Sequence, residues 1–378
     1  MARASAIHSC ADARRLARRR LPWMVFDYID GAAGEEHGAA MNRAALRALR
    51  LRSRVLVDVS RRDLSVPLFG AVAARPFGIS PMAMGNLACP GADLMMARFA
   101  ARDRVPLGVS TLSSTPMETL LEAAEGHAWF QLYFSGDGSD TLRLVDRARD
   151  AGYPVLVLTL DVPELGRRPR ELRHDFKMPF RIGPRQFLDF ALHPRWSLAG
   201  LLAGKPEPAN FRKPGFAFDR KASRAAADWS YLARLRDRWP GKLVAKGVLD
   251  TEDALRLRDA GVDAIQVSSH GGRQLDAAVP PILALRAIRA ALGPDFPLFY
   301  DSGIHSGEDV VKAYAMGADF VFLGRVVLFA LAAAQEAGLT RIRDMLSEEI
   351  EITLAQTGQT GMRALQGICL DAPRPGAR

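Results

Sequence analysis

The sequence is poor in cysteine and has no long uninterrupted apolar run. Its three cysteines, Cys10, Cys89 and Cys369, are isolated and odd in number, which argues against a disulfide framework and against a zinc site. We therefore expect a reducing compartment and no bound metal. No apolar stretch approaches the roughly 18–20 residues of a membrane-spanning helix. The arginine-rich N-terminus is not followed by the apolar region of a signal peptide.

The composition is that of a large globular protein with a basic balance. The 378 residues are 48% hydrophobic and 25% charged, which suits a single large domain. The 51 Lys and Arg exceed the 42 Asp and Glu, so the formal net charge is +9. This balance favours anionic partners, whether nucleic acid, acidic lipid or acidic small molecules, and does not choose among them.

Two helices are predicted near the N-terminus. Residues 9–20 have an amphipathic pattern, with Ser9 as the N-cap and Asp12 three residues later. A second helix is expected to begin at Pro22, because proline suits the first helical position, and to end at Gly31.

From Phe77 onward, short apolar strands alternate with helical patterns. Continuous apolar strands that alternate with helices predict a parallel sheet, and eight repeats predict a closed (β/α)8 barrel, the TIM barrel of the α/β class. An open doubly wound sheet is the alternative, but it normally brings a Gly-x-Gly-x-x-Gly turn that this sequence lacks. The eight predicted strands are Phe77–Ser80, Pro106–Ser110, Trp129–Tyr133, Val155–Thr159, Leu243–Lys246, Ala264–Val267, Pro297–Tyr300 and Asp319–Leu323.

The expected domain spans residues 1–371, with the barrel at about 77–335 and a disordered tail at 372–378. A long insertion follows the fourth strand at about 177–228, and excursions of this length are usually functional or disordered. Between 177 and 221 it holds nine Lys and Arg, three acids and several aromatic residues. Basic and aromatic residues together favour a surface that lies on an anionic membrane. A lid or a contact between subunits is the alternative.

The loop after the sixth strand carries the strongest chemical signal. It places His270 and Arg273 within four residues, separated by Gly271 and Gly272. Histidine exchanges a proton near neutral pH, and an arginine fork binds a carboxylate through two parallel hydrogen bonds. The glycines leave room for a flat ligand beside the backbone. A base beside a carboxylate clamp suits proton removal from an acid substrate, whereas a polar surface loop is the alternative.

Polar residues also stand at the ends of the other strands, and these ends meet on one face of a barrel. Hydroxyl and amide groups there suit the edges of a flavin ring, and a lysine stabilises negative charge on the reduced ring. The loops after strands seven and eight are typical of phosphate binding. The residues concerned are Ser110, Gln131, Thr159, Lys246, Asp301–Gly307, Gly324 and Arg325.

These motifs resemble the FMN-dependent L-2-hydroxy acid dehydrogenase and oxidase family. The likeness runs in order over nearly the whole chain and is most specific at His270–Asp276, which reads His-Gly-Gly-Arg-Gln-Leu-Asp. Within the insertion, His193–Leu198 is similar to the membrane-associated mandelate and L-lactate dehydrogenases. The resemblance also rests on Tyr28, Trp129–Tyr133, Leu158–Asp161, Lys246–Gly247, Ser268–Ser269, Asp301–Gly303 and Leu323–Arg325.

The resemblance implies FMN-dependent oxidation of a lactate- or mandelate-like L-2-hydroxy acid to the 2-oxo acid, with electrons passed to a membrane quinone or a similar acceptor. It implies a cytoplasmic homotetramer without a nucleic-acid partner, held peripherally on the inner face of the cell membrane by the insertion at 177–228. A soluble oxidase that reduces O2 to H2O2 is one alternative. A non-catalytic basic barrel that binds nucleic acid or membrane is an alternative of another class.

The family pattern further implies roles for individual residues. His270 is the implied base, and Asp161 is the partner that stabilises its imidazolium form. The implied substrate contacts are Tyr28, Tyr133, Arg168 and Arg273. The implied FMN contacts are Pro81, Met82, Ala83, Ser110, Gln131, Thr159, Lys246, Ser268, Asp301, Ser302, Gly303, His305, Gly324 and Arg325.

Several positions depart from the family pattern. The family has arginine where His305 stands, so we expect a weaker, pH-dependent clamp on the FMN phosphate, with Arg325 as the fixed charge. Met82 replaces a usual threonine, and Ser269 a usual asparagine. Ala83 stands where a mandelate-type member has glycine, which argues against a bulky aryl substrate.

Overall fold

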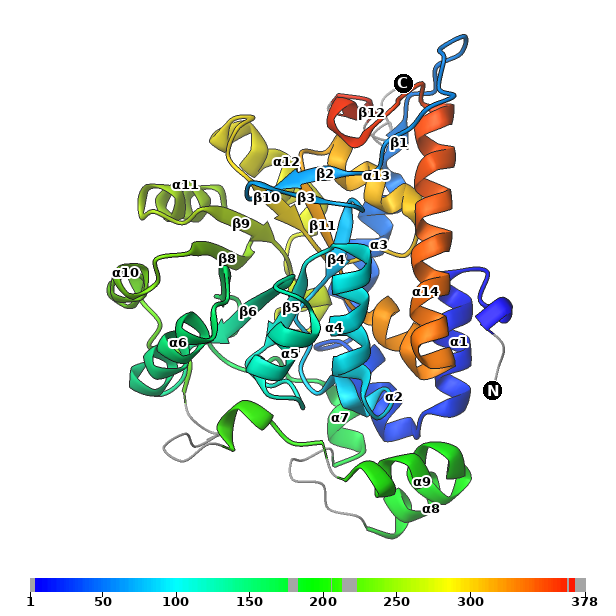
Figure 1. Ribbon diagram of the computed structural model, residues 1–378, viewed down its shortest axis with the longest axis vertical. Helices are drawn as coiled ribbons and strands as arrows, with labels where there is room; N and C mark the ends of the chain where they lie inside the picture. Colours follow the sequence, from blue (N-terminus) through cyan, green and yellow to red (C-terminus); the bar gives the residue numbers. More distant parts are fainter. Residues whose placement is uncertain (1–3, 176–182, 205, 213–222, 366, 371–378) are drawn as a thin grey trace.

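The computed structural model describes residues 4–175, 183–204, 206–212, 223–365 and 367–370. Its centre is a closed barrel in which all neighbouring strands are parallel, so the predicted (β/α)8 barrel is confirmed and the open sheet is excluded (Figure 1). The strands are β4 (Phe77–Ile79), β5 (Leu107–Ser110), β6 (Ala128–Tyr133), β7 (Val155–Thr159), β8 (Lys242–Val248), β9 (Ala264–Val267), β10 (Leu298–Tyr300) and β11 (Phe320–Leu323).

The barrel strands are buried almost throughout because side chains fill the interior and helices cover the outside. Aromatic rings pack the interior: Phe69 lies 5.6 Å from Trp129 and 5.5 Å from Phe299 between ring centroids. Phe69 follows β2 (Val66–Leu68), which pairs with β3 (Ala71–Ala73). The hydrophobic core of the barrel thus extends to the β2–β3 hairpin. The functional site is expected at the carboxyl ends of the barrel strands.

Helices follow most barrel strands along the chain and lie around the barrel (Figure 1). They are α4 (Ala92–Asp103), α5 (Met117–Ala123), α6 (Ser139–Ala151), α10 (Trp229–Arg238), α11 (Thr251–Asp259), α12 (Pro281–Leu292), α13 (Gly307–Ala315) and α14 (Arg325–Gln356). Short 3-10 turns are η1 (Ala4–Ala6), η2 (Gly85–Leu87), η3 (Ala209–Phe211), η4 (His270–Gly272) and η5 (Met362–Leu365), and β1 (Arg50–Leu51) pairs with β12 (Cys369–Leu370).

The N-terminal helices are α1 (Cys10–Arg20), α2 (Trp23–Asp30) and α3 (His37–Ala48). As predicted, the Ser9 side chain caps α1 by accepting the N–H of Asp12. The second helix begins at Trp23, one residue later than predicted, with Pro22 as its N-cap. Asp189 explains why the helix begins there, because its carboxylate accepts hydrogen bonds from the backbone N–H groups of Trp23 and Met24. Asp189 belongs to the insertion, which is distant in sequence.

The described part of the insertion contains α8 (Pro184–Leu192) and α9 (Pro194–Ala203), after the short α7 (Pro169–Arg173). Both helices lie at one end of the molecule beside α2 (Figure 1). The rest of the insertion, 177–182, 205 and 213–222, and the predicted tail at 372–378 lie outside the described residues. Among those described, no helix has both the length and the apolar character needed to cross a membrane.

Candidate active site

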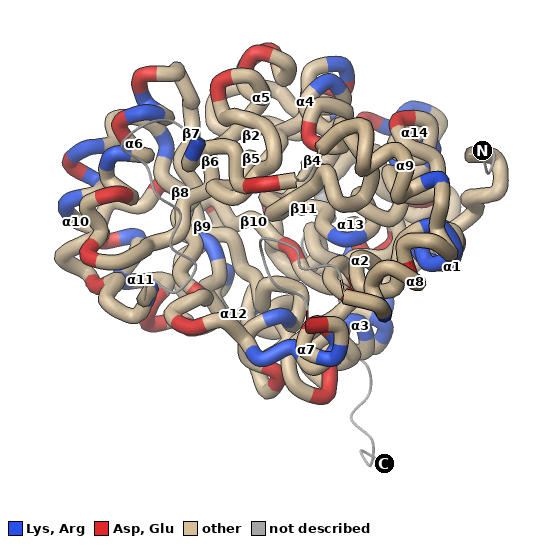
Figure 2. Tube along the Cα trace, turned by 90° about the horizontal axis from the view of Figure 1, so that it is seen from below, with Lys and Arg blue, Asp and Glu red and all other residues tan. Residues whose placement is uncertain are grey.

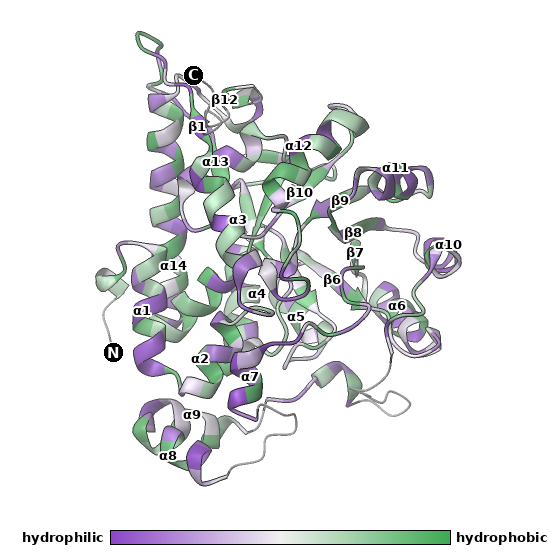
Figure 3. Cartoon of the chain, turned by 180° about the vertical axis from the view of Figure 1, so that it is seen from behind, coloured by the Kyte–Doolittle hydropathy of each residue, from purple (hydrophilic) through white to green (hydrophobic). Residues whose placement is uncertain are grey.

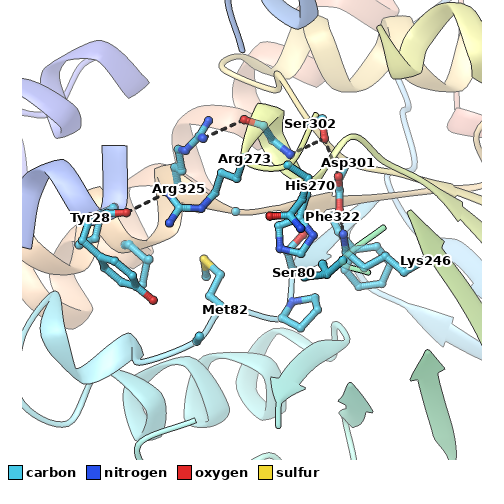
Figure 4. A pocket seen from close by; sticks show the side chains of 18 of the residues that line it. Tyr28, Ser80, Met82, Lys246, His270, Arg273, Asp301, Ser302, Phe322 and Arg325 are labelled. Atoms are coloured by element: carbon cyan, nitrogen blue, oxygen red, sulfur yellow. Dashed lines mark hydrogen bonds and ion pairs between the residues drawn. The ribbon is translucent and has the colours of Figure 1, made fainter. Parts of the chain in front are cut away.

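A cavity of about 250 Å³ lies at the carboxyl ends of the barrel strands. Side chains from α2, β8, the β9 loop and α14 reach it, as Figure 4 shows for Tyr28, Lys246, His270 and Arg325. Residues far apart in sequence therefore face one space. The predicted residues that line it are Tyr28, Pro81, Met82, Ala83, Tyr133, Arg168, Lys246, His270, Arg273, Asp301, Ser302, Gly303, His305, Gly324 and Arg325.

The other predicted site residues stand behind this lining and support it. Gln131 donates through Nε2 to the hydroxyl of Thr159 at 2.9 Å. The hydroxyl of Ser268 accepts from Lys246 Nζ at 2.9 Å. The predicted residues that are not in the wall of the cavity are Ser110, Gln131, Thr159, Asp161 and Ser268.

His270 and Asp161 form a partly buried pair. The Nδ1 atom of His270 lies 3.0 Å from Asp161 Oδ1, so the carboxylate accepts an Nδ1–H and the Nε2 lone pair is left to act as a base. Gly247 leaves the space that the Asp161 side chain occupies, because a Cβ at position 247 would lie 2.5 Å from Asp161 Cγ. Burial lowers the pKa of His270 below its ordinary value, although Asp161 opposes the shift. The imidazole is therefore neutral at pH 7.

Arg273 is fixed by backbone and carboxylate acceptors. Its Nη1 donates to the carbonyls of Tyr28 at 2.8 Å and Gly31 at 2.7 Å, and its Nη2 lies 2.9 Å from Glu171 Oε1. Among the described residues, no acceptor is found for its Nε–H. The Nε–H and one Nη2–H of a guanidinium point along the same edge, which is the geometry that binds a carboxylate in two parallel bonds.

Arg168 lies next to Arg273 and shares its carboxylate partner. Its Nη1 is 3.1 Å from Glu171 Oε1, and its Nε donates to the Arg273 carbonyl at 3.2 Å. Sequence reasoning missed Glu171, which balances two guanidinium groups. No motif marks it, because its role arises only when α7 packs beside the β9 loop.

Tyr133 stacks beside His270, with ring centroids 6.4 Å apart and an interplanar angle of 29°. Burial raises the pKa of Tyr133, so its hydroxyl stays protonated and is a hydrogen-bond donor at neutral pH. Arg224 lies over the same ring at 5.7 Å and also lines the cavity. Sequence reasoning missed Arg224, because it stands at the end of the insertion, outside any recognisable motif.

Lys246 is buried at the end of β8 and stays charged. Its Nζ lies 3.2 Å from Asp301 Oδ2. Burial lowers the pKa of Lys246, but Asp301 and Asp161 outweigh burial and the net shift is upward. A fixed cation in this place suits negative charge that develops on a bound ring.

Buried polar atoms without hydrogen-bond partners test whether these residues fit FMN. Among the described residues, Ser80 Oγ, Gln131 Oε1 and Arg325 Nε are buried without a partner. Such groups are rare in folded proteins and call for an explanation. A flavin supplies hydrogen-bonding groups along its ring edge and a phosphate at its other end. The donor set at this cavity therefore fits FMN.

The loops after β10 and β11, which also line the cavity, have the features of a phosphate site. Ser302 and Gly303 have consecutive positive φ angles of 85° and 91°, so the loop after β10 turns sharply where it lines the cavity. Gly324 and Arg325 begin the long helix α14, whose N-terminus favours an anion. Both segments line the cavity beside His305.

Comparison with known proteins identifies the family. The model of the FMN-dependent dehydrogenase family matches residues 17–372. The chain is 40% identical over 354 residues to (S)-mandelate dehydrogenase of Pseudomonas putida, covering 92% of this chain and 89% of the relative. It is 37% identical over 362 residues to L-lactate dehydrogenase of Pectobacterium atrosepticum, covering 93% and 94% of the two chains.

Solved structures agree with the sequence comparison. The crystal structure of the monotopic membrane protein (S)-mandelate dehydrogenase superposes with a TM-score of 0.92 at 38% identity, covering 97% of this chain and 99% of that chain. A mandelate oxidase variant in complex with (S)-mandelic acid gives a TM-score of 0.82 at 36% identity, covering 95% and 96%. The fold, the cavity and the matched sequence lead to one conclusion: this chain belongs to the family of FMN-dependent dehydrogenases.

Proposed function

We propose that the protein oxidises an L-2-hydroxy acid to the 2-oxo acid with FMN as its first electron acceptor. The observation that carries this proposal is the geometry of His270 and Arg273, a base and a carboxylate clamp that line one cavity. The names of the relatives, (S)-mandelate and L-lactate dehydrogenases, support the same substrate class. Met82 and Ala83 line the cavity, and each is larger than the threonine or glycine of the family pattern, which favours a substrate with a small aliphatic side chain.

In this mechanism, different residues of the cavity bind the substrate carboxylate, bind its hydroxyl group and remove the hydroxyl proton. The Nε–H and Nη2–H groups of Arg273 bind the carboxylate, while Tyr133 donates to the hydroxyl oxygen. FMN, when bound, would supply the acceptor for the hydrogen of the Cα–H bond together with its two electrons. His270 takes the hydroxyl proton at Nε2, and Asp161 stabilises the imidazolium that results.

An absorbance experiment tests the proposal directly. The purified protein is expected to show an oxidised flavin spectrum that bleaches when L-lactate or L-mandelate is added without oxygen. The D-enantiomers serve as matched controls, because they present the Cα–H bond in the wrong direction. A yellow protein whose spectrum responds to no L-2-hydroxy acid would contradict the assignment.

The pH dependence of the reaction follows from His270. The base must be neutral, and its pKa lies below the ordinary 6.5 because it is buried. We expect kcat/KM to be level at and above neutral pH and to fall at acidic pH as His270 takes up a proton. Rapid-mixing measurements of flavin reduction over pH 4.5–8 check this expectation. A decline that begins above pH 7 would assign the titration to another group.

The outer faces of α8 and α9 support a peripheral membrane contact and a quinone-type acceptor. Phe187, Leu201 and Leu202 are 68%, 79% and 89% exposed, and Figure 3 shows apolar stretches on this helix pair. The inner side is anchored, because Trp196 Nε1 donates to the Leu87 carbonyl and Asp189 caps α2. An anchored helix pair with an apolar outer face suits insertion into the lipid interface. We propose that it places a homotetramer on the inner face of the cell membrane.

Replacing Leu201 and Leu202 together with glutamate is expected to reduce vesicle binding by at least about tenfold, since each leucine contributes up to roughly 1.5–3 kcal/mol when buried in lipid. Both side chains are exposed, so the fold should be kept. Co-sedimentation with phospholipid vesicles measures the effect. Leu283→Glu, an exposed leucine on α12, is the matched control.

Activity with a soluble dye should be unchanged in the double variant, while activity with a membrane quinone should fall. Equal vesicle binding by the variant and the parent protein would overturn the membrane assignment. Rapid release of H2O2 in air would instead favour the soluble oxidase.

A further inference from the structure

A group of arginines lies around His305, which lines the cavity. Arg43 and Arg47 lie one turn apart on α3, Arg14 comes from α1, and Arg325 begins α14. Burial, together with these four guanidinium groups, lowers the pKa of His305 to about 4. His305 is therefore neutral at pH 7 and is a hydrogen-bonding group rather than a cation.

Nearby acids balance only part of the positive charge in this group. Arg14 pairs with Asp30. Asp309 accepts the backbone N–H of His305 at 2.9 Å. Arg43 and Arg47 are exposed, and neither has an ion pair or a side-chain hydrogen bond with any residue that the structure describes. An excess of fixed cations beside a cavity attracts an anion.

The helix α3 lies directly against the loop that carries His305. Asn42 donates through Nδ2 to Ser269 Oγ at 2.8 Å. A Cβ on Gly303 would lie 3.1 Å from Leu46 Cδ1 and 3.2 Å from the Asn42 backbone. The helix and the loop are thus in close contact, and Arg43 and Arg47 follow the contacting residues Asn42 and Leu46 directly in α3, on its exposed side. Basic positions on α1 and α3 are marked in Figure 2.

We propose that Arg43 and Arg47 of α3 supply the fixed positive charge that binds the phosphate of FMN, in place of a guanidinium at position 305. The inference rests on the proposed function, because it takes the Gly303–His305 end of the cavity as the phosphate end. The loop supplies backbone N–H groups, Arg325 lies at the helix N-terminus, and α3 neutralises the dianion from outside. FMN retention then depends on a helix that precedes the barrel in the chain.

Riboflavin isolates the contribution of the phosphate, because it is FMN without that group. The full-length protein is freed of flavin and titrated with FMN and with riboflavin, following the quenching of flavin fluorescence at low and high salt. In the holoenzyme, the rate of FMN release after dilution provides a second readout. The variants are Arg43→Gln, Arg47→Gln and the double variant, with Arg98→Gln on the exposed side of α4 as the control.

Each single variant is expected to weaken FMN binding by about twofold to fivefold at low salt, and the double variant by about tenfold, with less effect at high salt. Riboflavin affinity should not change. Adding His305→Arg to the double variant should restore FMN affinity, because it returns a fixed charge to the loop.

Two results would overturn the inference while leaving the proposed function intact. One is FMN affinity in the double variant equal to that of the parent protein. The other is an equal loss of FMN and riboflavin affinity, which would mean that α3 only supports the fold. A parent protein that binds neither flavin would remove the inference together with the proposed function.

Discussion

Replacing His270 with glutamine is expected to slow flavin reduction by the substrate about 10²- to 10⁴-fold while FMN stays bound, because a positioned general base contributes that much. Glutamine is similar in length, but it does not accept a proton at neutral pH. Asp161, 3.0 Å from Nδ1 in the parent protein, then has no imidazolium to stabilise. Anaerobic rapid mixing measures the reduction rate, and the visible spectrum reports the bound flavin.

The variant Asp161→Asn distinguishes the contribution of Asp161 from that of His270. Its amide keeps the approximate shape beside His270 but does not stabilise the imidazolium, so we expect a smaller loss of rate than in His270→Gln. Reduction at the parental rate in His270→Gln, with a normal flavin spectrum, would remove His270 as the base.

Replacing Arg273 with lysine is expected to lower kcat/KM by about 10²- to 10³-fold, since hydrogen bonds to charged groups contribute roughly 1.5–3 kcal/mol each. Arg273 uses Nη1 to hold the carbonyls of Tyr28 and Gly31 and Nη2 to contact Glu171, and it still has an edge for the substrate. A lysine ammonium has three donors at one point and cannot serve both sides. Most of the loss should appear in KM.

Steady-state kinetics with varied L-2-hydroxy acid measures this effect. Arg168→Lys is the matched control, because its guanidinium also contacts Glu171 but its Nε donates to the Arg273 carbonyl. Arg168→Lys should lower kcat/KM by a smaller factor than Arg273→Lys does. An unchanged KM in Arg273→Lys would count against the carboxylate clamp.

Much of this molecule follows from local pattern. Eight apolar segments alternate with helical ones, and a closed barrel buries eight such strands on both faces. The barrel then brings the strand ends together, so His270, Lys246 and Arg325 could be expected at one cavity from their positions alone. The Ser9 cap of α1 could be predicted in the same way, because Ser9 and the N–H group that donates to it are three residues apart.

The sequence by itself determined the barrel, the order of its strands and the loop that holds the base and the clamp, because each depends on periodicity or on neighbours in the chain. Only the tertiary structure decided the contacts made across long separations. Asp189 caps α2, Glu171 joins two arginines, and Arg43 and Arg47 stand beside His305. Such contacts depend on how helices pack against loops. The sequence around a charged residue on a helix does not indicate which distant residue will lie next to it in the folded protein.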